Sequence, residues 1–278
     1  MDSGVADYLR AVVLGAIQAL TEFLPISSSG HLLLAGRVMG DDISSLTFDV
    51  GLHLGTLAAV LLYFWRDWTG MALSSVTDAV EHQWHLSRWT TQGRLACLVV
   101  LGTLPAVIAG GLLDTYIEEH VRGAGVVGVT LILGAGLLWV ADRFVAQQGL
   151  ERLRARNALT IGLAQTVALI PGMSRSGMTI SAARMMGFDR VSAARFSFFL
   201  SAPVVAGAAV LKLGKALTGD EAVAWGPLAL GAITSGVCGL LVIRWLLGYM
   251  QRGTLGVFVW YRIALGLAVL AAVAGGLL

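Results

Sequence analysis

Apolar residues gather in long continuous runs along this chain. Six of the runs approach the roughly 20 residues that a helix needs to cross the hydrocarbon of a membrane. They cover residues 47–65, 95–113, 125–142, 194–214, 227–247 and 257–277. The pattern therefore predicts an all-α polytopic membrane protein with six full spans.

Two further apolar segments are broken by helix-terminating residues. Pro25 ends a helix predicted over residues 5–24, and a second short helix follows it to about residue 38. In the same way, Pro171 and Gly172 interrupt the segment 157–188. The helices within each segment are too short to span, and broken backbone is tolerated at membrane depth only where protein or a wet cavity surrounds it. We therefore predict two re-entrant hairpins, at residues 5–40 and 157–188.

The two hairpins share a sequence pattern, which indicates an internal repeat. In both, a glycine and a glutamine three residues later precede a serine-rich turn, and the two copies are 147 residues apart: Gly15, Gln18 and Ser27-Ser28-Ser29-Gly30, against Gly162, Gln165 and Ser174-Arg175-Ser176-Gly177. One membrane domain, 1–278, would then hold repeat halves at 1–145 and 157–278. A hairpin and three spans cross the membrane an odd number of times, so the halves come out inverted. Such repeats place a site near the bilayer midplane.

Composition and charge narrow the class of protein. The chain is 56% hydrophobic and only 13% charged, with a mean hydropathy of +0.78, which excludes an ordinary soluble domain. Its formal net charge of +2 and its scattered arginines give no nucleic-acid footprint. The two cysteines, Cys97 and Cys238, lie within apolar spans and are expected to be packing residues.

The connections between spans predict the orientation. A polar loop is expected over residues 66–93, and a basic connection carries Arg143, Arg152, Arg154 and Arg156. The positive-inside rule makes this basic connection cytoplasmic. The hairpin at 157–188 then enters from the cytoplasm and the hairpin at 5–40 from the opposite side.

Arg175 is a charge inside otherwise apolar sequence, where it costs roughly 2.5 to 3.5 kcal/mol and usually marks function. The helix break before it frees backbone N–H groups beside a guanidinium, and such a corner binds phosphate. The predicted phosphate contacts in this motif are Ser174, Ser176, Gly177 and Thr179.

The first motif adds groups of a hydrolase. Glu22 could act as a general base or hold a divalent cation, with Gln18 contributing through water. His31 could be the nucleophile or the base that activates Ser27, and both alternatives stay open. Further phosphate contacts are expected from Ser28, Ser29 and Gly30, and support from Asp49 and His53.

Structural roles are the alternative for each group. Arg175 could clamp helix carbonyls, Glu22 could be a neutral acid within a bundle, and Ser28 and Ser29 could only cap a helix. An anion transporter or a flippase for a phosphate-bearing lipid is the rival function, since inverted repeats are common in carriers. A carrier, however, has no need of a nucleophile beside a base.

Together the two motifs resemble the BacA-type undecaprenyl-diphosphate phosphatase family. The resemblance rests on Gln18-x-x-x-Glu22-Phe23-Leu24-Pro25-x-Ser27-Ser28-x-Gly30-His31 and on Pro171-Gly172-x-Ser174-Arg175-Ser176-x-x-Thr179. It implies hydrolysis of a C55 isoprenyl diphosphate to the monophosphate, which recycles the lipid carrier of bacterial cell-wall synthesis and gives bacitracin resistance.

The resemblance also implies catalytic positions, a cofactor and a location. The catalytic residues would be Glu22, Ser27, His31 and Arg175, aided by a divalent cation, Mg²⁺ or Ca²⁺. The protein would be a multi-pass protein of the bacterial plasma membrane, with its active site open to the outer, periplasmic face. Gln18 stands where many relatives carry a second glutamate, and an amide cannot act as a base, so Glu22 would manage protons alone.

Overall fold

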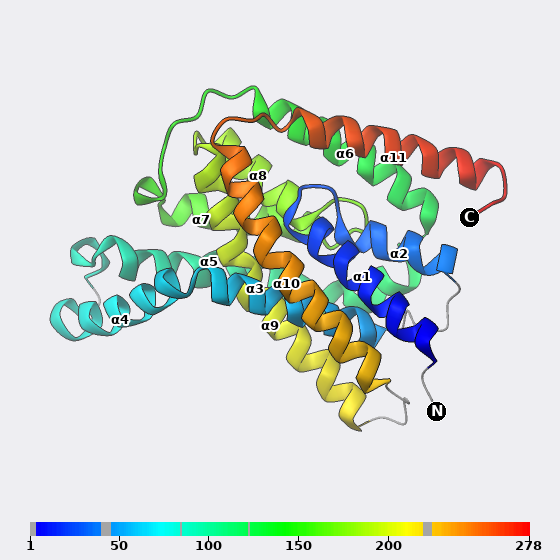
Figure 1. Ribbon diagram of the computed structural model, residues 1–278. Coiled ribbons are helices and arrows are strands. Elements are labelled where there is room, and N and C mark those ends of the chain that lie inside the picture. The colour runs from blue at the N-terminus through cyan, green and yellow to red at the C-terminus, as the bar shows by residue number, and fades with distance from the viewer. Residues whose placement is uncertain (1–3, 40–45, 84, 122, 219–223) are drawn as a thin grey trace.

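The computed structural model describes residues 4–39, 46–83, 85–121, 123–218 and 224–278. Helices α1 to α11 make up nearly all of the regular structure in these segments (Figure 1). The all-α fold class is therefore confirmed. The expected end of the first hairpin, at residue 40, lies outside the described residues.

The helices follow one another with short connections. The first part of the chain forms α1 (Val5–Phe23), α2 (Ser28–Met39), α3 (Leu46–Tyr63), α4 (Trp65–His82), α5 (Thr91–His120) and α6 (Ala124–Asp142). The second part forms α7 (Ala155–Val167), α8 (Arg175–Met185), α9 (Arg190–Thr218), α10 (Trp225–Met250) and α11 (Gly256–Ala274). Short 3₁₀ turns at Leu86–Arg88 and Leu150–Arg152 lie in two of the connections.

Among the described residues, five single helices have membrane-spanning length and apolar character: α5, α6, α9, α10 and α11. A sixth span is formed if α3 and α4 are counted together, although they are bent by 71° at the break between them. The polytopic architecture is confirmed, and five of the six predicted runs correspond to single long helices.

The predicted polar loop over residues 66–93 is wrong, because Trp65–His82 forms α4. Polar sequence does not prevent a helix, since a helix satisfies its own backbone groups, and no proline interrupts this one. Tertiary contacts anchor it: Met71 is buried, and Asp67 accepts a hydrogen bond from Arg195 of α9 at 2.5 Å. These contacts could not be read from the local sequence.

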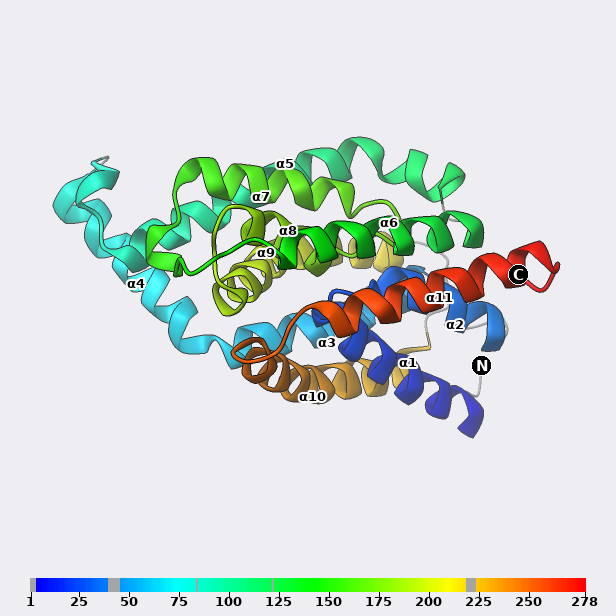
Figure 2. The same cartoon turned by 90° about the horizontal axis from the view of Figure 1, so that it is seen from above.

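The two broken segments fold as helical hairpins whose turns meet inside the molecule. The α1–α2 hairpin opens toward the end that holds both termini, and the α7–α8 hairpin opens toward the opposite end, near α4 (Figures 1 and 2). The boundaries α1–α2 and α7–α8 agree with the predicted hairpins to within a few residues. This arrangement is the one an inverted repeat requires, and the repeat itself stays a prediction.

Repeated glycines allow the hairpins to pack closely. Gly15 of α1 faces the backbone of Gly231 in α10, and Gly162 of α7 faces the backbone of Gly102 in α5, so that a Cβ at either repeat position would collide. Small residues let membrane helices approach each other in this way. The contact gives a physical reason for the glycine in the repeated motif.

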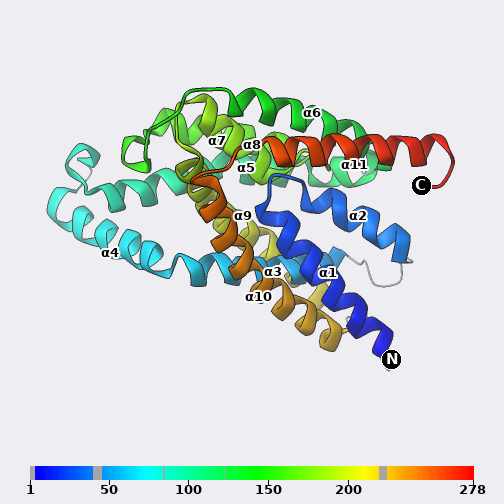
Figure 3. The ribbon, with the colours of Figure 1, turned by 45° about the horizontal axis from the view of Figure 1, so that its top comes forward.

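Two layers enclose the hairpin turns. Helices α6 and α11 run side by side over one face, as Figure 3 shows. Beneath the turns lies an aromatic cluster in which Phe23 of α1 meets Phe198 of α9 at a centroid distance of 5.4 Å, and Phe64 meets Phe199 at 5.1 Å. The turns are therefore held between a helical cover and a packed aromatic core.

Candidate active site

Two serines give the hairpin turns the same local conformation. Ser27 has φ 79° and Ser174 has φ 70°, in the left-handed region that costs a residue other than glycine about 1–3 kcal/mol. Each precedes a helix and accepts a hydrogen bond from a backbone N–H three residues on, at 3.4 Å from Gly30 and 3.1 Å from Gly177. Strain of this kind is concentrated at functional sites.

The carboxylate of Glu22 is the centre of the site, because groups from three helical segments converge on it. Oε1 accepts a hydrogen bond from Arg175 Nη2 at 2.9 Å. Oε2 accepts hydrogen bonds from Ser28 Oγ at 2.5 Å and Gln18 Nε2 at 3.2 Å. His53 Nε2 of α3 lies 3.6 Å from Oε2. The structure thus brings both sequence motifs together around one buried acid.

Arg175 joins the two hairpins and leaves only a small part of its side chain exposed. Besides Glu22, its guanidinium donates to the backbone carbonyl of Ser197 in α9 at 3.1 Å. A buried arginine–carboxylate pair of this kind is costly to desolvate and is weak evidence for stability by itself. The pair joins the two strained turns through one charged contact.

The hydroxyls of the second motif are engaged with protein groups. Ser176 Oγ donates to Leu24 O at 2.9 Å, which ties the second hairpin to the first. Thr179, which is fully buried, donates to Ser197 Oγ at 2.7 Å. These contacts support the position of Arg175, and the phosphate-binding role of the two hydroxyls stays a prediction.

His31 has both ring nitrogens in hydrogen bonds of 2.7 Å, one from Nδ1 to Ser27 O and one between Nε2 and Tyr261 Oη. A carbonyl only accepts, so neutral His31 carries its proton on Nδ1, and its Nε2 accepts from the tyrosine. The Ser27 hydroxyl lies instead within 3.3 Å of Ser29 Oγ. The imidazole and the Ser27 hydroxyl therefore do not form a base–nucleophile pair.

Tyr261 is a site residue that sequence reasoning missed. It lies in α11, far from both motifs in the chain, and its ring stacks on His31 with a centroid distance of 5.7 Å and an interplanar angle of 8°. A tyrosine in an apolar span carries no strong signal, because its hydroxyl matters only once the fold brings it to the histidine.

Arg262, the next residue, was also missed and is fully buried. Its guanidinium donates to Pro25 O of the first turn at 3.0 Å, and to Gly172 O and Met173 O of the second turn at 3.0 and 3.1 Å. One side chain thus holds both turns. The signal was present in the sequence, since a charge inside the apolar run 257–277 should be treated as functional.

The remaining predicted residues lie in α3 and at the start of α2. His53 Nδ1 donates to the backbone carbonyl of Asp49 at 2.7 Å, which orients the imidazole toward the acid. Gly30 is buried in the first turn, Ser28 is half-buried, and Ser29 is exposed at its rim. The supporting roles expected for Asp49 and His53 stay a prediction.

A divalent cation would find a small set of oxygen donors here. Gln18 Oε1 is buried and has no hydrogen-bond partner in the described part of the chain, and it belongs to the side chain that contacts Glu22. Within the same residues, no cluster of three His, Cys, Asp or Glu side chains could hold a metal. The donors therefore fit an ion such as Mg²⁺ that takes most of its ligands from phosphate and water.

The chain is similar in sequence to proteins of one known family. The family described as "Bacitracin resistance protein BacA" matches residues 11–268. The chain belongs to this family. It is 47% identical over 268 residues to a Geobacter sulfurreducens protein and 45% identical over 274 residues to one from Pelobacter propionicus, each named "Undecaprenyl-diphosphatase". These alignments cover 95% and 97% of this chain and 98% of each relative, so the BacA resemblance extends well beyond the two motifs.

Proposed function

We propose that the protein hydrolyses undecaprenyl diphosphate to undecaprenyl phosphate and inorganic phosphate, as the names of its relatives indicate. The observation that carries the proposal is the Glu22–Arg175 contact of 2.9 Å between the hairpin turns, with His31 in the same first turn. Phosphoryl transfer needs positioned positive charge and an oriented attacking group, and this pair of turns offers both. The activity would recycle the lipid carrier of cell-wall synthesis and contribute to bacitracin resistance.

In the bound state, Arg175 would exchange Glu22 for the terminal phosphate of the substrate. A guanidinium binds phosphate in a bidentate manner, and the N-termini of α2 and α8 add backbone donors. Glu22 Oε2 would still accept from Ser28 and Gln18, and Oε1, which Arg175 had left, would be free next to the reacting group. Glu22 and Gln18 Oε1 would hold the divalent cation, which would neutralise charge on the diphosphate.

We infer that His31 Nε2 is the attacking atom. Its lone pair accepts a hydrogen bond from Tyr261 Oη and would be freed when the substrate displaces that hydroxyl, whereas Ser27 is 1% exposed and its hydroxyl is engaged within the turn. Attack on the terminal phosphorus forms an N–P bond, breaks the bridging P–O bond and releases the lipid monophosphate. Water then cleaves the N–P bond as Glu22 accepts its proton, giving inorganic phosphate and restoring the imidazole.

The test is phosphate release from a C55 isoprenyl diphosphate by purified protein, with and without Mg²⁺ or Ca²⁺. Arg175→Ala, Glu22→Gln and His31→Ala should each lose at least about 100-fold in turnover, the scale of one catalytic group. Ser27→Ala should keep most of it. Glu81→Gln and His85→Ala, at exposed positions in and after α4, are matched controls.

The same purified protein shows whether His31 or Ser27 attacks the phosphorus, and whether the protein is a hydrolase or a carrier. A trapped phosphoprotein should be labile in acid, as phosphohistidine is, while an acid-stable label lost in Ser27→Ala would move the attack to the serine. Wild-type protein that is folded yet releases no phosphate under any of these conditions would be a carrier for the lipid or its phosphate.

A further inference from the structure

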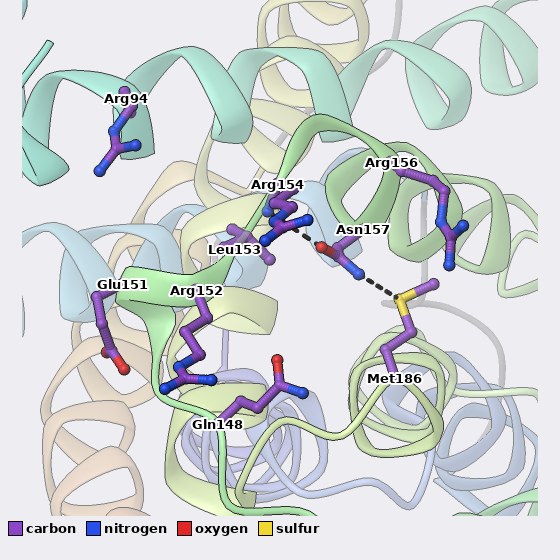
Figure 4. Close-up of a pocket in the computed structure, with 9 residues that line it drawn as sticks. All are labelled: Arg94, Gln148, Glu151, Arg152, Leu153, Arg154, Arg156, Asn157 and Met186. Atoms are coloured by element: carbon purple, nitrogen blue, oxygen red, sulfur yellow. Dashed lines mark hydrogen bonds between the residues drawn. The ribbon is translucent and has the colours of Figure 1, made fainter. Parts of the chain in front are cut away.

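A second polar pocket, distinct from the Glu22 site, lies beside the connection between α6 and α7. It has a volume of about 710 Å³ and is shown in Figure 4. Its lining comes from α5, from the α6–α7 connection, from the first turn of α7 and from the end of α8. The residues are Arg94, Gln148, Glu151, Arg152, Leu153, Arg154, Arg156, Asn157 and Met186.

The charges around this pocket are unbalanced. Four arginines meet a single acid, Glu151, whose carboxylate folds back over Gly149. None of the four arginines has an ion-pair partner among the described residues. Like charges around one cavity repel, and an anion in the middle would relieve the repulsion.

The N-terminus of α7 adds to the positive potential. The first turn of this 13-residue helix holds no acidic residue, and Arg154 and Arg156 flank its start. Arginine at the positive end of a helix dipole is unfavourable by itself, whereas an anion there is favourable. The positive-inside rule accounts for basic residues in this connection. It does not account for their closing on a cavity together with Arg94, which comes from α5.

The pocket walls are fixed by hydrogen bonds. Asn157 Oδ1 accepts from Arg154 N at 3.1 Å, and Asn157 Nδ2 donates to Met186 Sδ at 3.6 Å. Gln148 is joined to the segment after α8 by backbone hydrogen bonds of 3.0 Å to Gly187 and Asp189. The arginines therefore extend from a scaffold that is already ordered.

We propose that this pocket binds a phosphate group, carried either by an anionic lipid headgroup or by free phosphate. Guanidinium groups match phosphate geometry bidentately, and basic pockets at the cytoplasmic ends of membrane helices bind lipid headgroups. The pocket also touches Met186, directly after the helix that begins at Arg175, so its ligand would steady α8 from the end opposite the Glu22 site.

The test measures thermal unfolding of the detergent-purified protein during titration with three probes: phosphatidylglycerol, phosphatidylcholine and inorganic phosphate against chloride at equal ionic strength. It is run in wild type and in Arg175→Ala, so that phosphate at the Glu22 site is not the reporter. Phosphatidylglycerol or inorganic phosphate should raise the melting temperature in both backgrounds. A response to the lipid alone identifies a headgroup, and a response to both identifies the phosphate group itself.

The pocket variant is Arg152→Gln with Arg154→Gln and Arg156→Gln, and its control is Arg244→Gln with Arg252→Gln, which removes exposed arginines elsewhere. The pocket variant should need at least about ten times more probe for the same shift, while the control should match wild type. The single variant Arg94→Gln repeats the measurement if the triple variant does not fold. An equal response in pocket variant and wild type, or no response to any probe, would overturn the proposal. Neither result depends on hydrolysis, so this proposal and the proposed activity can fail separately.

Discussion

At the scale of single residues, the polar groups of the site are hydrogen-bonded to one another. Glu22 is 7% exposed and its two oxygens accept hydrogen bonds from Arg175, Ser28 and Gln18. Removing one member of a buried charged pair leaves the other uncompensated and usually costs 3–5 kcal/mol. Arg175→Ala should therefore weaken folding as well as activity, which is why the unfolding of each variant needs to be measured beside its turnover.

The hydroxyl of Tyr261 allows a test of whether its hydrogen bond to His31 affects turnover. Tyr261→Phe keeps the stacked ring but removes the 2.7 Å hydrogen bond to Nε2. This bond occupies the lone pair that attacks, so it must break before the N–P bond forms, and one neutral hydrogen bond is worth about 1 kcal/mol. kcat should therefore rise roughly fivefold. KM and the melting temperature should change little. The matched control is Tyr116→Phe, because Tyr116 stacks on His120 outside the site at a centroid distance of 4.6 Å. Equal kcat values for Tyr261→Phe and wild type, with the same pH profile, would show that the contact is incidental.

The residues visible from the sequence were those within continuous motifs. Gln18 and Glu22 are four residues apart in one helix, so their spacing already placed them on one face. Ser28 lies beyond the break at Pro25, and the fold brings it to Glu22. Tyr261 and Arg262 belong to the site only through the packing of α11 on α6, which no local pattern specifies. Arg262 could still have been suspected as a charge in an apolar run, whereas nothing marked its neighbour.

At the scale of helices, the sequence predicted where helices are broken more easily than where they bend or where a polar segment is helical. Pro25 and the Pro171-Gly172 pair remove backbone donors and free the chain to turn, so both hairpins were predicted close to their observed bounds. Helix α4 was missed because its polarity resembles that of a loop, and its stability comes from contacts such as the Asp67–Arg195 ion pair. The 71° bend after Tyr63 was not predicted from the sequence either.

Arg262 should prove essential to how the hairpins are held. Arg262→Met keeps much of the side-chain volume but removes every donor to the carbonyls of Pro25, Gly172 and Met173. Buried acceptors left without partners cost about 1–3 kcal/mol each, so the melting temperature should fall by many degrees and turnover should fall with it. Arg244→Met, at an exposed position on α10, is the control and should unfold like wild type. If Arg262→Met keeps the wild-type melting temperature, the two turns are stable without the hydrogen bonds from Arg262.

At the scale of the whole molecule, the two hairpins define two ends. Their turns meet in the interior while their open ends face opposite ways (Figure 2). The basic pocket lies at the end where α7 begins, and both termini lie at the other end (Figure 1). The two hairpins that carry the sequence pattern repeated 147 residues apart therefore face opposite ways, although the sequence alone gave no packing partner for either one. The inverted repeat itself stays a prediction.

This geometry predicts the sidedness of the protein in its membrane. Val5 begins α1 and is 77% exposed, and Val145 lies in the basic connection and is 90% exposed. In a background with Cys97→Ala and Cys238→Ala, the Val5→Cys variant should react with a membrane-impermeant maleimide added to intact spheroplasts. The Val145→Cys variant should react only after permeabilisation, because the positive-inside rule places the basic connection in the cytoplasm. Labelling of both thiols from one side would contradict the inverted arrangement. A reversed pattern would keep that arrangement but place the open end of the α1–α2 hairpin on the cytoplasmic side.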